Sequence, residues 1–474
     1  MFYHGFLSSK PLLSIEIIIL LLYGILLIIK INNTQNSLID IRLIAIISYI
    51  LYSIYTPVVY LIYNKSYYFR LAPYLTAYNY SDITKTVFIS ILFLIGFSIP
   101  IIVSKESKQV KPKEDKNIKY KKASFYLWLI ISVLAFLWYI YPYIYLGLKD
   151  ALNYDRGYRY LLFTNIYDSL GGISKILNLA LSQYVILISF PMLFRRILLN
   201  KGWVKEKIIF FLYITIVCIF FLFIDGRRRE VMYIIMMCFS YYIISSNKKI
   251  NLKDIMKYSI YLILIAAFFI SYQYFRNYFT LAAKEGVKYA IDAKRQQDTR
   301  LDKEYKLYGN EFGMVYENIL SAVKYTPKPM LGKTYIEAII APIPIINRII
   351  YYNDQTKIPL IGKWYSKLYP KIFDTGGGLG FSPAAESYLN LGFLGCILYG
   401  ILFGFLFNAI YYKLCNNTYA IYYCLLLPQG WNFSRISSLG VTKEIFWYVF
   451  YYIFYSILIE IFARERKESK FKNE

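Results

Sequence analysis

The sequence has almost no histidine and few acidic residues. His4 is the single histidine in 474 residues, which excludes Ser-His-Asp triads, histidine metal sites and histidine proton relays. Chemistry must therefore come from Arg, Lys, Asp, Glu, Tyr or Ser. The 54 Lys and Arg outnumber the 29 Asp and Glu, leaving a net charge of +25. Because these basic residues lie between apolar segments, an anionic lipid surface or headgroup is the expected partner, and not nucleic acid.

Paired cysteines and a signal-peptide cleavage site are also missing. The five cysteines show no CxxC spacing and lie in or beside apolar segments, so they predict packing and no metal site; no cofactor is expected. They are Cys218, Cys238, Cys396, Cys415 and Cys424. The first apolar segment, 12–29, lacks a small-residue cleavage site, which predicts an uncleaved anchor.

Long apolar segments dominate the chain. Hydrophobic residues make up 58% of it and the mean hydropathy is +0.41, above the usual range for soluble domains. We predict one all-α polytopic membrane domain, 1–474, with about eleven transmembrane helices. The expected spans are 12–29, 41–63, 86–103, 124–147, 173–194, 207–224, 230–245, 254–274, 386–412, 418–428 and 443–462.

Basic residues in the short loops set the expected orientation. The segment 104–122 carries eight lysines and is predicted to be cytoplasmic. Alternation of the spans then places three further basic clusters inside and the N-terminus outside. The same alternation places a long segment, 275–385, outside. Its composition leaves open whether this extracytoplasmic loop is a mobile flap or a folded cap.

The most distinctive local pattern is a turn with three consecutive arginines, Asp225-Gly-Arg-Arg-Arg-Glu230. Gly226 permits a tight reversal, and Asp225 is expected to cap the following helix. Three guanidiniums at a helix N-terminus on the outer side suit a diphosphate, and they run against the positive-inside rule. The simpler interpretation is that these arginines, Arg227, Arg228 and Arg229, reach lipid phosphate as membrane anchors.

Other arginines are predicted on the same side of the membrane. Arg156 and Arg159 lie in an Asn-Tyr-Asp-Arg-Gly-Tyr-Arg segment, and Arg276 follows the span 254–274. Each is a candidate ligand for lipid diphosphate or glycan, with ordinary interfacial anchoring as the alternative.

A second pattern lies at 376–395, where a glycine-rich segment leads into a late helix. Ser382 is predicted as its N-cap and Pro383 as its first residue. Glu386 then falls one place beyond the position of a capping box, so it is free to act as a base or to complement the helix dipole. Small residues recur every fourth position below it and predict close helix packing. They are Gly392, Cys396, Gly400 and Gly404.

These two patterns, together with the large late loop, resemble the Wzy-type O-antigen and oligosaccharide repeat-unit polymerases. The resemblance implies an enzyme of the bacterial cytoplasmic (inner) membrane with a GT-C-like fold. It implies that undecaprenyl-diphosphate-linked repeat units are joined on the extracytoplasmic side. A chain-length regulator and a flippase of the same pathway are the expected protein partners.

The residues fit this chemistry. Arginines would stabilise the leaving lipid diphosphate without a metal ion, and Glu386 would accept the proton of the attacking hydroxyl, with Glu230 or Asp225 in reserve. An O-antigen ligase would share the donor chemistry and stays an alternative. A lipid-linked oligosaccharide flippase is disfavoured, because ionisable residues are scarce inside the predicted spans.

Overall fold

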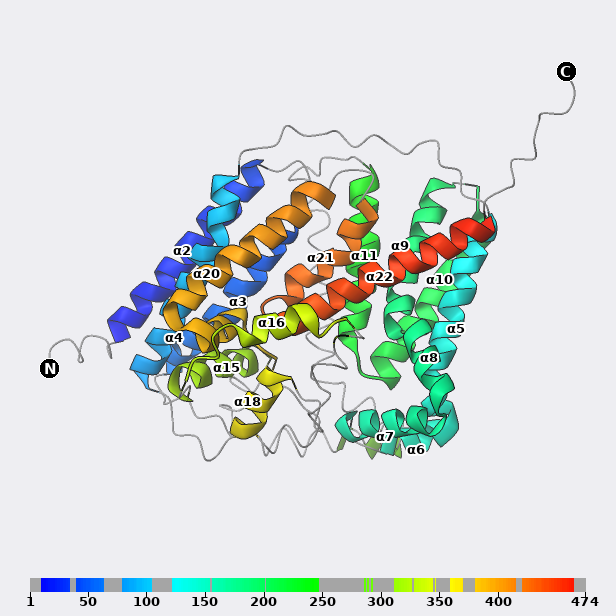
Figure 1. Cartoon of the computed structure of the whole chain (residues 1–474), viewed down its shortest axis with the longest axis horizontal. Coiled ribbons are helices and arrows are strands. Elements are labelled where there is room, and N and C mark those ends of the chain that lie inside the picture. Colours follow the sequence, from blue (N-terminus) through cyan, green and yellow to red (C-terminus); the bar gives the residue numbers. More distant parts are fainter. Residues whose placement is uncertain are drawn as a thin grey trace, which may run out of the picture. The chain divides into compact units, whose positions relative to one another are not determined.

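Helices are the regular elements throughout the part of the chain that the structure describes, which confirms the all-α class (Figure 1). The structure is a computed structural model. It describes residues 10–34, 40–63, 79–104, 122–153, 156–200, 202–246, 285–286, 288–289, 291–292, 311–325, 328–343, 346, 359–369, 380–414 and 420–463.

Seven helical segments are long and apolar enough to cross a membrane, and each coincides with a predicted span. They are Lys10–Asn32, Ile41–Ile62, Tyr80–Val103, Lys122–Leu146, Gly172–Leu199, Val204–Ile224 and Pro383–Tyr412. The chain is therefore a polytopic membrane protein.

The other four predicted spans have different outcomes. The segments 230–245 and 443–462 are helical, within α11 (Arg228–Ser246) and α22 (Ser438–Ala463), but neither helix is among the seven. The segment 418–428 lies largely in the 13-residue α21 (Ala420–Asn432). The segment 254–274 lies outside the described residues.

The chain divides into two compact units. Unit 1 comprises 1–111, 292–416 and 426–445, and unit 2 comprises 112–291, 417–425 and 446–474. The helices of unit 1 are α2 (Lys10–Thr34), α3 (Ile41–Tyr63), α4 (Tyr80–Val103), α15 (Glu311–Tyr325), α16 (Lys333–Ile340), α18 (Leu360–Leu368) and α20 (Pro383–Leu414). The helices of unit 2 are α5 (Lys122–Leu146), α6 (Leu148–Asn153), α7 (Arg156–Ser169), α8 (Gly172–Ala180), α9 (Gln183–Leu199), α10 (Val204–Ile219), η1 (Phe220–Ile224) and α11. Both α21 and α22 have residues in each unit.

In unit 1, glycines allow α20 and α4 to pack backbone against backbone (Figure 1). A Cβ atom at Gly400 would lie 2.5 Å from the Phe93 carbonyl oxygen, and one at Gly404 would lie 2.3 Å from that of Phe97. A Cβ atom at Gly96 on α4 would likewise lie 2.3 Å from the Ile397 carbonyl oxygen. The predicted packing role of the small residues is confirmed for Gly400 and Gly404.

Gly392 has a different role from the one predicted. It has a φ of 61°, and with Leu391 it forms a kink that divides α20 into two helices. A Cβ added there would have nothing within 4 Å, so the glycine is needed for conformation and not for close packing. The N–H groups of Met330 and Leu331 donate to the carbonyls of residues 389 and 390, at 2.8 and 3.0 Å.

The described part of the segment 275–385 is folded. Its helix α15 packs on α3, α4 and α20 and buries Tyr316 and Leu320 completely. Short helices α16 and α18 follow, and Glu337 of α16 accepts the Leu360 N–H at the start of α18, at 3.0 Å. Helices α15, α16 and α18 are therefore a folded part of unit 1.

In unit 2, the predicted span 173–194 is broken. α8 ends at Ala180, α9 begins at Gln183, and the two residues between them are not helical. The carbonyls of Leu179 and Ala180 at this break accept hydrogen bonds from the hydroxyls of Tyr451 and Tyr455, so the protein itself satisfies the backbone groups that the break frees.

Candidate functional site

The arginine turn of unit 2 is built on an irregular helix end. α10 continues as one turn of π-helix, η1, in which the Asp225 N–H donates to the Phe220 carbonyl at 3.0 Å. Gly226 then has a φ of 72°, and the Arg227 N–H donates to Phe221 at 2.7 Å. The predicted reversal at Gly226 is confirmed, and α11 starts directly after it. Single π turns occur frequently at functional sites.

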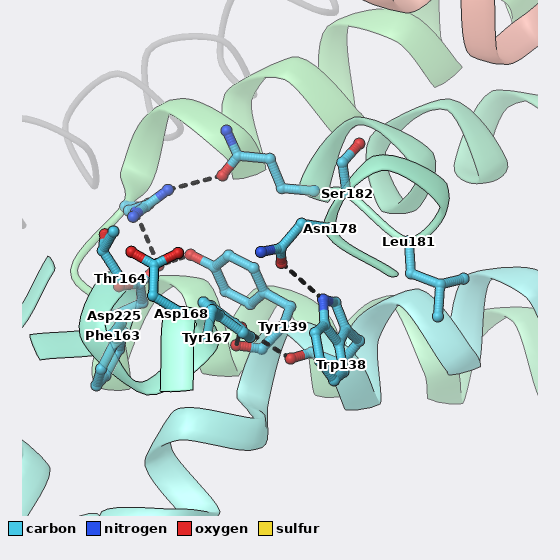
Figure 2. Close-up of a pocket in the computed structure, with 12 residues that line it drawn as sticks. Trp138, Tyr139, Phe163, Thr164, Tyr167, Asp168, Asn178, Leu181, Ser182 and Asp225 are labelled. Atoms are coloured by element: carbon cyan, nitrogen blue, oxygen red, sulfur yellow. Dashed lines mark hydrogen bonds and ion pairs between the residues drawn. The ribbon is translucent and has the colours of Figure 1, made fainter. Parts of the chain in front are cut away.

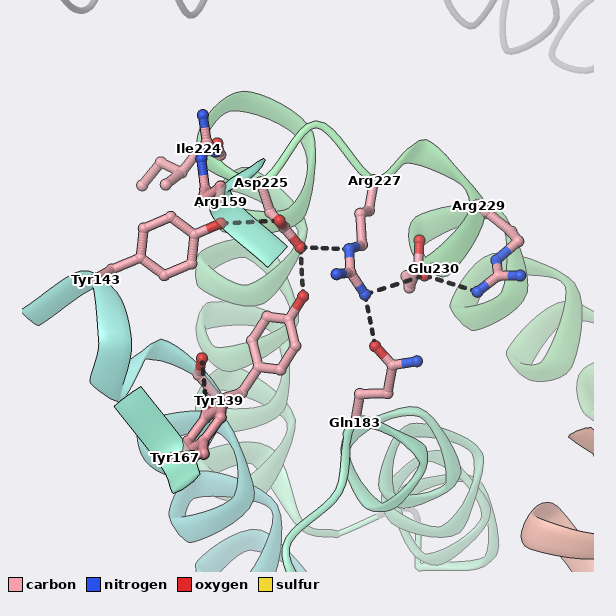
Figure 3. A network of polar contacts seen from close by, with 10 residues as sticks. All are labelled: Tyr139, Tyr143, Arg159, Tyr167, Gln183, Ile224, Asp225, Arg227, Arg229 and Glu230. Carbon is pink, nitrogen blue, oxygen red and sulfur yellow. Dashed lines mark hydrogen bonds and ion pairs between the residues drawn. The ribbon is translucent and has the colours of Figure 1, made fainter. Parts of the chain in front are cut away.

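Asp225 lies at the centre of this turn (Figure 3). Its side chain is 6% exposed and accepts hydrogen bonds from the hydroxyls of Tyr139 and Tyr143, the second at 2.8 Å. Arg227 Nε pairs with the same carboxylate at 2.9 Å. Through these contacts Asp225 ties α5 to the turn.

Arg227 is held from three sides. Besides Asp225, its Nη1 donates to Gln183 Oε1 at 2.7 Å and lies 4.0 Å from Glu230 (Figure 3). Burial alone would lower the pKa of the Arg227 guanidinium, but the neighbouring Tyr139 and the Asp225 and Glu230 carboxylates outweigh it and raise that pKa above its ordinary value. Arg227 therefore stays charged and fixed, and it connects the turn to the first residue of α9.

Two further predicted arginines lie at the same turn. Arg229 pairs with Glu230 at 3.1 Å. Arg159 of α7 is 6% exposed and donates to the Ile224 carbonyl at 3.3 Å. The structure thus brings Arg159, Arg227 and Arg229 together, and Arg228 opens α11 between the last two. Four arginines against two carboxylates leave a surplus of two positive charges.

The side chains of the two remaining predicted arginines are not among those that the structure describes. Arg156 is the first residue of α7, and its side chain lies outside the described part of the molecule. Arg276 lies wholly outside the described residues.

A cavity of about 310 Å³ adjoins the turn in unit 2 (Figure 2). Asp225 and Arg227 form one wall. The other walls come from α5, α7 and the break between α8 and α9. They comprise Trp138, Tyr139, Phe163, Thr164, Tyr167, Asp168, Asn178, Leu181, Ser182 and Gln183.

Glu386 lies in unit 1, in a different setting. Ser382 and Pro383 begin α20 as predicted, with the Ala384 N–H donating to Ser382 Oγ at 3.3 Å. The Glu386 carboxylate, 1% exposed, accepts three hydrogen bonds. Thr334 Oγ1 donates at 2.9 Å, the Ser438 N–H at 2.7 Å and Ser438 Oγ at 2.5 Å. Glu386 therefore joins α20 to α16 and to the first residue of α22.

Two contributors near these sites were not among the predicted residues. Gln183 has no motif around it, but it supplies the side-chain amide that orients Arg227. Arg435, between α21 and α22, forms an ion pair and hydrogen bond with Glu311 of α15. Its carbonyl also accepts the Phe381 N–H at 2.8 Å, next to the start of α20. In the sequence, Arg435 is distinguished only as a basic residue in a short segment between two predicted spans.

The acidic side chains do not gather into a metal centre in the part of the chain that the structure describes. No group of three or more His, Cys, Asp or Glu residues comes together among them. Asp225 and Glu230, the two carboxylates of the arginine turn, are paired with arginines.

Comparison with known proteins identifies the family. No curated protein matches the sequence, and no solved structure does so either. Residues 1–466 match the family described as O-antigen polysaccharide polymerase Wzy, which is essentially the whole chain. A match of this length includes both the arginine turn and the Glu386 region, and the helical membrane architecture agrees with it. The chain therefore belongs to the O-antigen polysaccharide polymerase Wzy family.

Proposed function

We propose that this protein polymerises undecaprenyl-diphosphate-linked oligosaccharide repeat units on the extracytoplasmic side of the bacterial cytoplasmic membrane. The family match over residues 1–466 carries the proposal, because polymerisation of repeat units is the reaction of that family. The lysine-rich segment 104–122 supports the orientation, since it would place the arginine turn outside.

The proposed reaction is a glycosyl transfer between two lipid-linked substrates. The bond between the anomeric carbon of the growing chain and its diphosphate oxygen breaks, and undecaprenyl diphosphate leaves. A hydroxyl oxygen of the incoming repeat unit forms the new glycosidic bond, and its proton passes to a base. Negative charge therefore accumulates on the diphosphate, where guanidinium groups stabilise it most.

The arginine turn supports a division of labour in binding that diphosphate. Arg227 is held by Asp225 and Gln183, so we assign it to positioning the turn. Arg228 and Arg229 start α11, where the helix N-terminus adds favourable N–H groups and dipole. We assign these two to the phosphates, whereas Arg159, which is 6% exposed and donates to the Ile224 carbonyl, stays a candidate from the sequence. Arg156 and Arg276 stay candidates from the sequence for the same substrate.

Glu386 is the proposed proton acceptor. Its carboxylate is fixed in one orientation by Thr334 and Ser438, as a base must be. The same contacts would also be made by a residue that only links helices. Glu386→Gln distinguishes the two roles, because it lowers turnover only if Glu386 is the base.

The proposed function is tested by deleting the gene and resolving the surface glycan on a gel. A polymerase deletion leaves acceptors capped with a single repeat unit. A ligase deletion leaves no glycan on the acceptor, and a flippase deletion traps repeat units inside, so either of these patterns would refute the proposal. Purified protein should then extend lipid-linked repeat units in vitro.

A further inference from the structure

The cavity beside the arginine turn has an aromatic side. Trp138 and Tyr139 come from α5, and Phe163 and Tyr167 from α7 (Figure 2). The Tyr167 hydroxyl donates to the Trp138 carbonyl at 2.9 Å, and the two rings lie 5.1 Å apart. These contacts hold the aromatic rings in place before any ligand binds.

Most of the other residues that line the cavity are polar, and some of them bond to these rings. Asn178 Oδ1 accepts the Trp138 indole N–H at 2.9 Å, so its amide nitrogen is still available to donate. Asp168 is exposed, and its carboxylate has no hydrogen-bond or ionic partner among the described residues. Arg227, Asp225 and Gln183, the last at the helix break, are the other charged or amide side chains that line the cavity.

This combination selects among ligand classes. An acyl chain would bury the Asp168 carboxylate, which has no partner among the described residues, and this burial costs free energy. A bare phosphate would be repelled by two carboxylates and would gain nothing from four aromatic rings. A sugar ring fits both the aromatic and the polar residues, because its C–H faces pack on aromatic rings and its hydroxyls bond to carboxylate, amide and guanidinium groups.

We infer that this cavity binds the sugar ring attached to the diphosphate of the lipid-linked donor. The inference rests on the proposed function and deepens it. The cavity volume of about 310 Å³ lies at the lower end of ligand pockets and is sufficient for one sugar ring. Arg227 is shared by the cavity and the turn, so a ring in the cavity adjoins a diphosphate at Arg228 and Arg229.

Two binding measurements test the inference. The probes are undecaprenyl diphosphate and the lipid-linked repeat unit extracted from a strain that lacks this gene, each titrated against purified protein in nanodiscs. The pocket variants are Asp168→Ala and Asn178→Ala. The matched controls are Asp150→Ala and Asn165→Ala, exposed residues of unit 2 that do not line the cavity.

We expect the pocket variants to bind the repeat-unit lipid at least about 10-fold more weakly, while their affinity for undecaprenyl diphosphate stays within about twofold of the wild type. The controls should match the wild type for both probes. Equal weakening for both probes would mean a lipid or phosphate pocket, and no weakening would mean an unused cavity; either overturns the inference. Polymerisation by the wild type is measured separately, so the proposed function and the sugar pocket can fail independently.

Discussion

Removing the Glu386 carboxylate should strongly destabilise the protein. Three donors point at this buried group, and hydrogen bonds to a charged group contribute roughly 1.5–3 kcal/mol each. The cost of burying the carboxylate offsets part of that sum, but Glu386→Ala also leaves the three donors unsatisfied, so we expect a loss of about 3–5 kcal/mol. For a unit of this size that lowers the unfolding midpoint by about 6–20 °C.

Glu386→Gln separates the structural role from the catalytic one. Glutamine keeps one oxygen for the Ser438 N–H, and hydroxyls can accept from its amide, so we expect a stability loss of only about 1–2 kcal/mol. If Glu386 is the base, turnover should still fall by about 10² or more. If it only links helices, turnover per folded molecule should stay close to the wild type.

The assay combines thermal unfolding of purified protein with polymerisation of lipid-linked repeat units. Ser438→Ala is the comparison variant, because it removes one donor and leaves the carboxylate in place. A double-mutant cycle of Glu386→Gln and Ser438→Ala should show a coupling of about 0.5–3 kcal/mol. Unfolding of Glu386→Ala within about 1 °C of the wild type would refute the hydrogen-bond reasoning.

Three further predictions concern the arginine turn. Arg227→Lys should lower the unfolding midpoint and shorten the glycan, because one ammonium cannot reach both Asp225 and Gln183; a wild-type midpoint would contradict this. Arg228→Lys should reduce polymerisation in vitro, since lysine keeps the charge but lacks the bidentate fork; polymer of normal length would instead favour simple lipid anchoring. Gly226→Ala should cost about 1–2 kcal/mol of stability, measured by thermal unfolding, because a φ of 72° is unfavourable for alanine; an unchanged midpoint would show that the turn adapts.

The start of α20 shows how much local sequence can predict. Ser382 and Pro383 define a helix N-terminus by their own chemistry, and the glycines at four-residue spacing define a packing face. The kink at Gly392 was not predictable in the same way. It depends on Met330 and Leu331, which lie about 60 residues earlier and supply the N–H groups that bond to the carbonyls just before it.

The arginine turn divides in the same way between local and distant determinants. Gly226 and the charges around it are visible in six consecutive residues, and the reversal follows from them. The partners of Asp225 are two tyrosines on α5, more than 80 residues earlier in a segment rich in aromatic residues. Nothing in that segment distinguishes Tyr139 and Tyr143 from their neighbours, so only the fold identifies them.

These contacts change what three adjacent arginines mean chemically. Read as a sequence, they are three equivalent positive charges for an anion. In the structure, Asp225 compensates the charge of Arg227, and the Arg227 guanidinium bonds to protein groups. These bonds give the turn a rigid shape. Rigidly held guanidinium groups stabilise a transition state more than mobile ones do, because they need no reorganisation when charge develops on the leaving group. The acidic residues that lower the net charge of the cluster therefore support the catalysis that we propose for its remaining arginines.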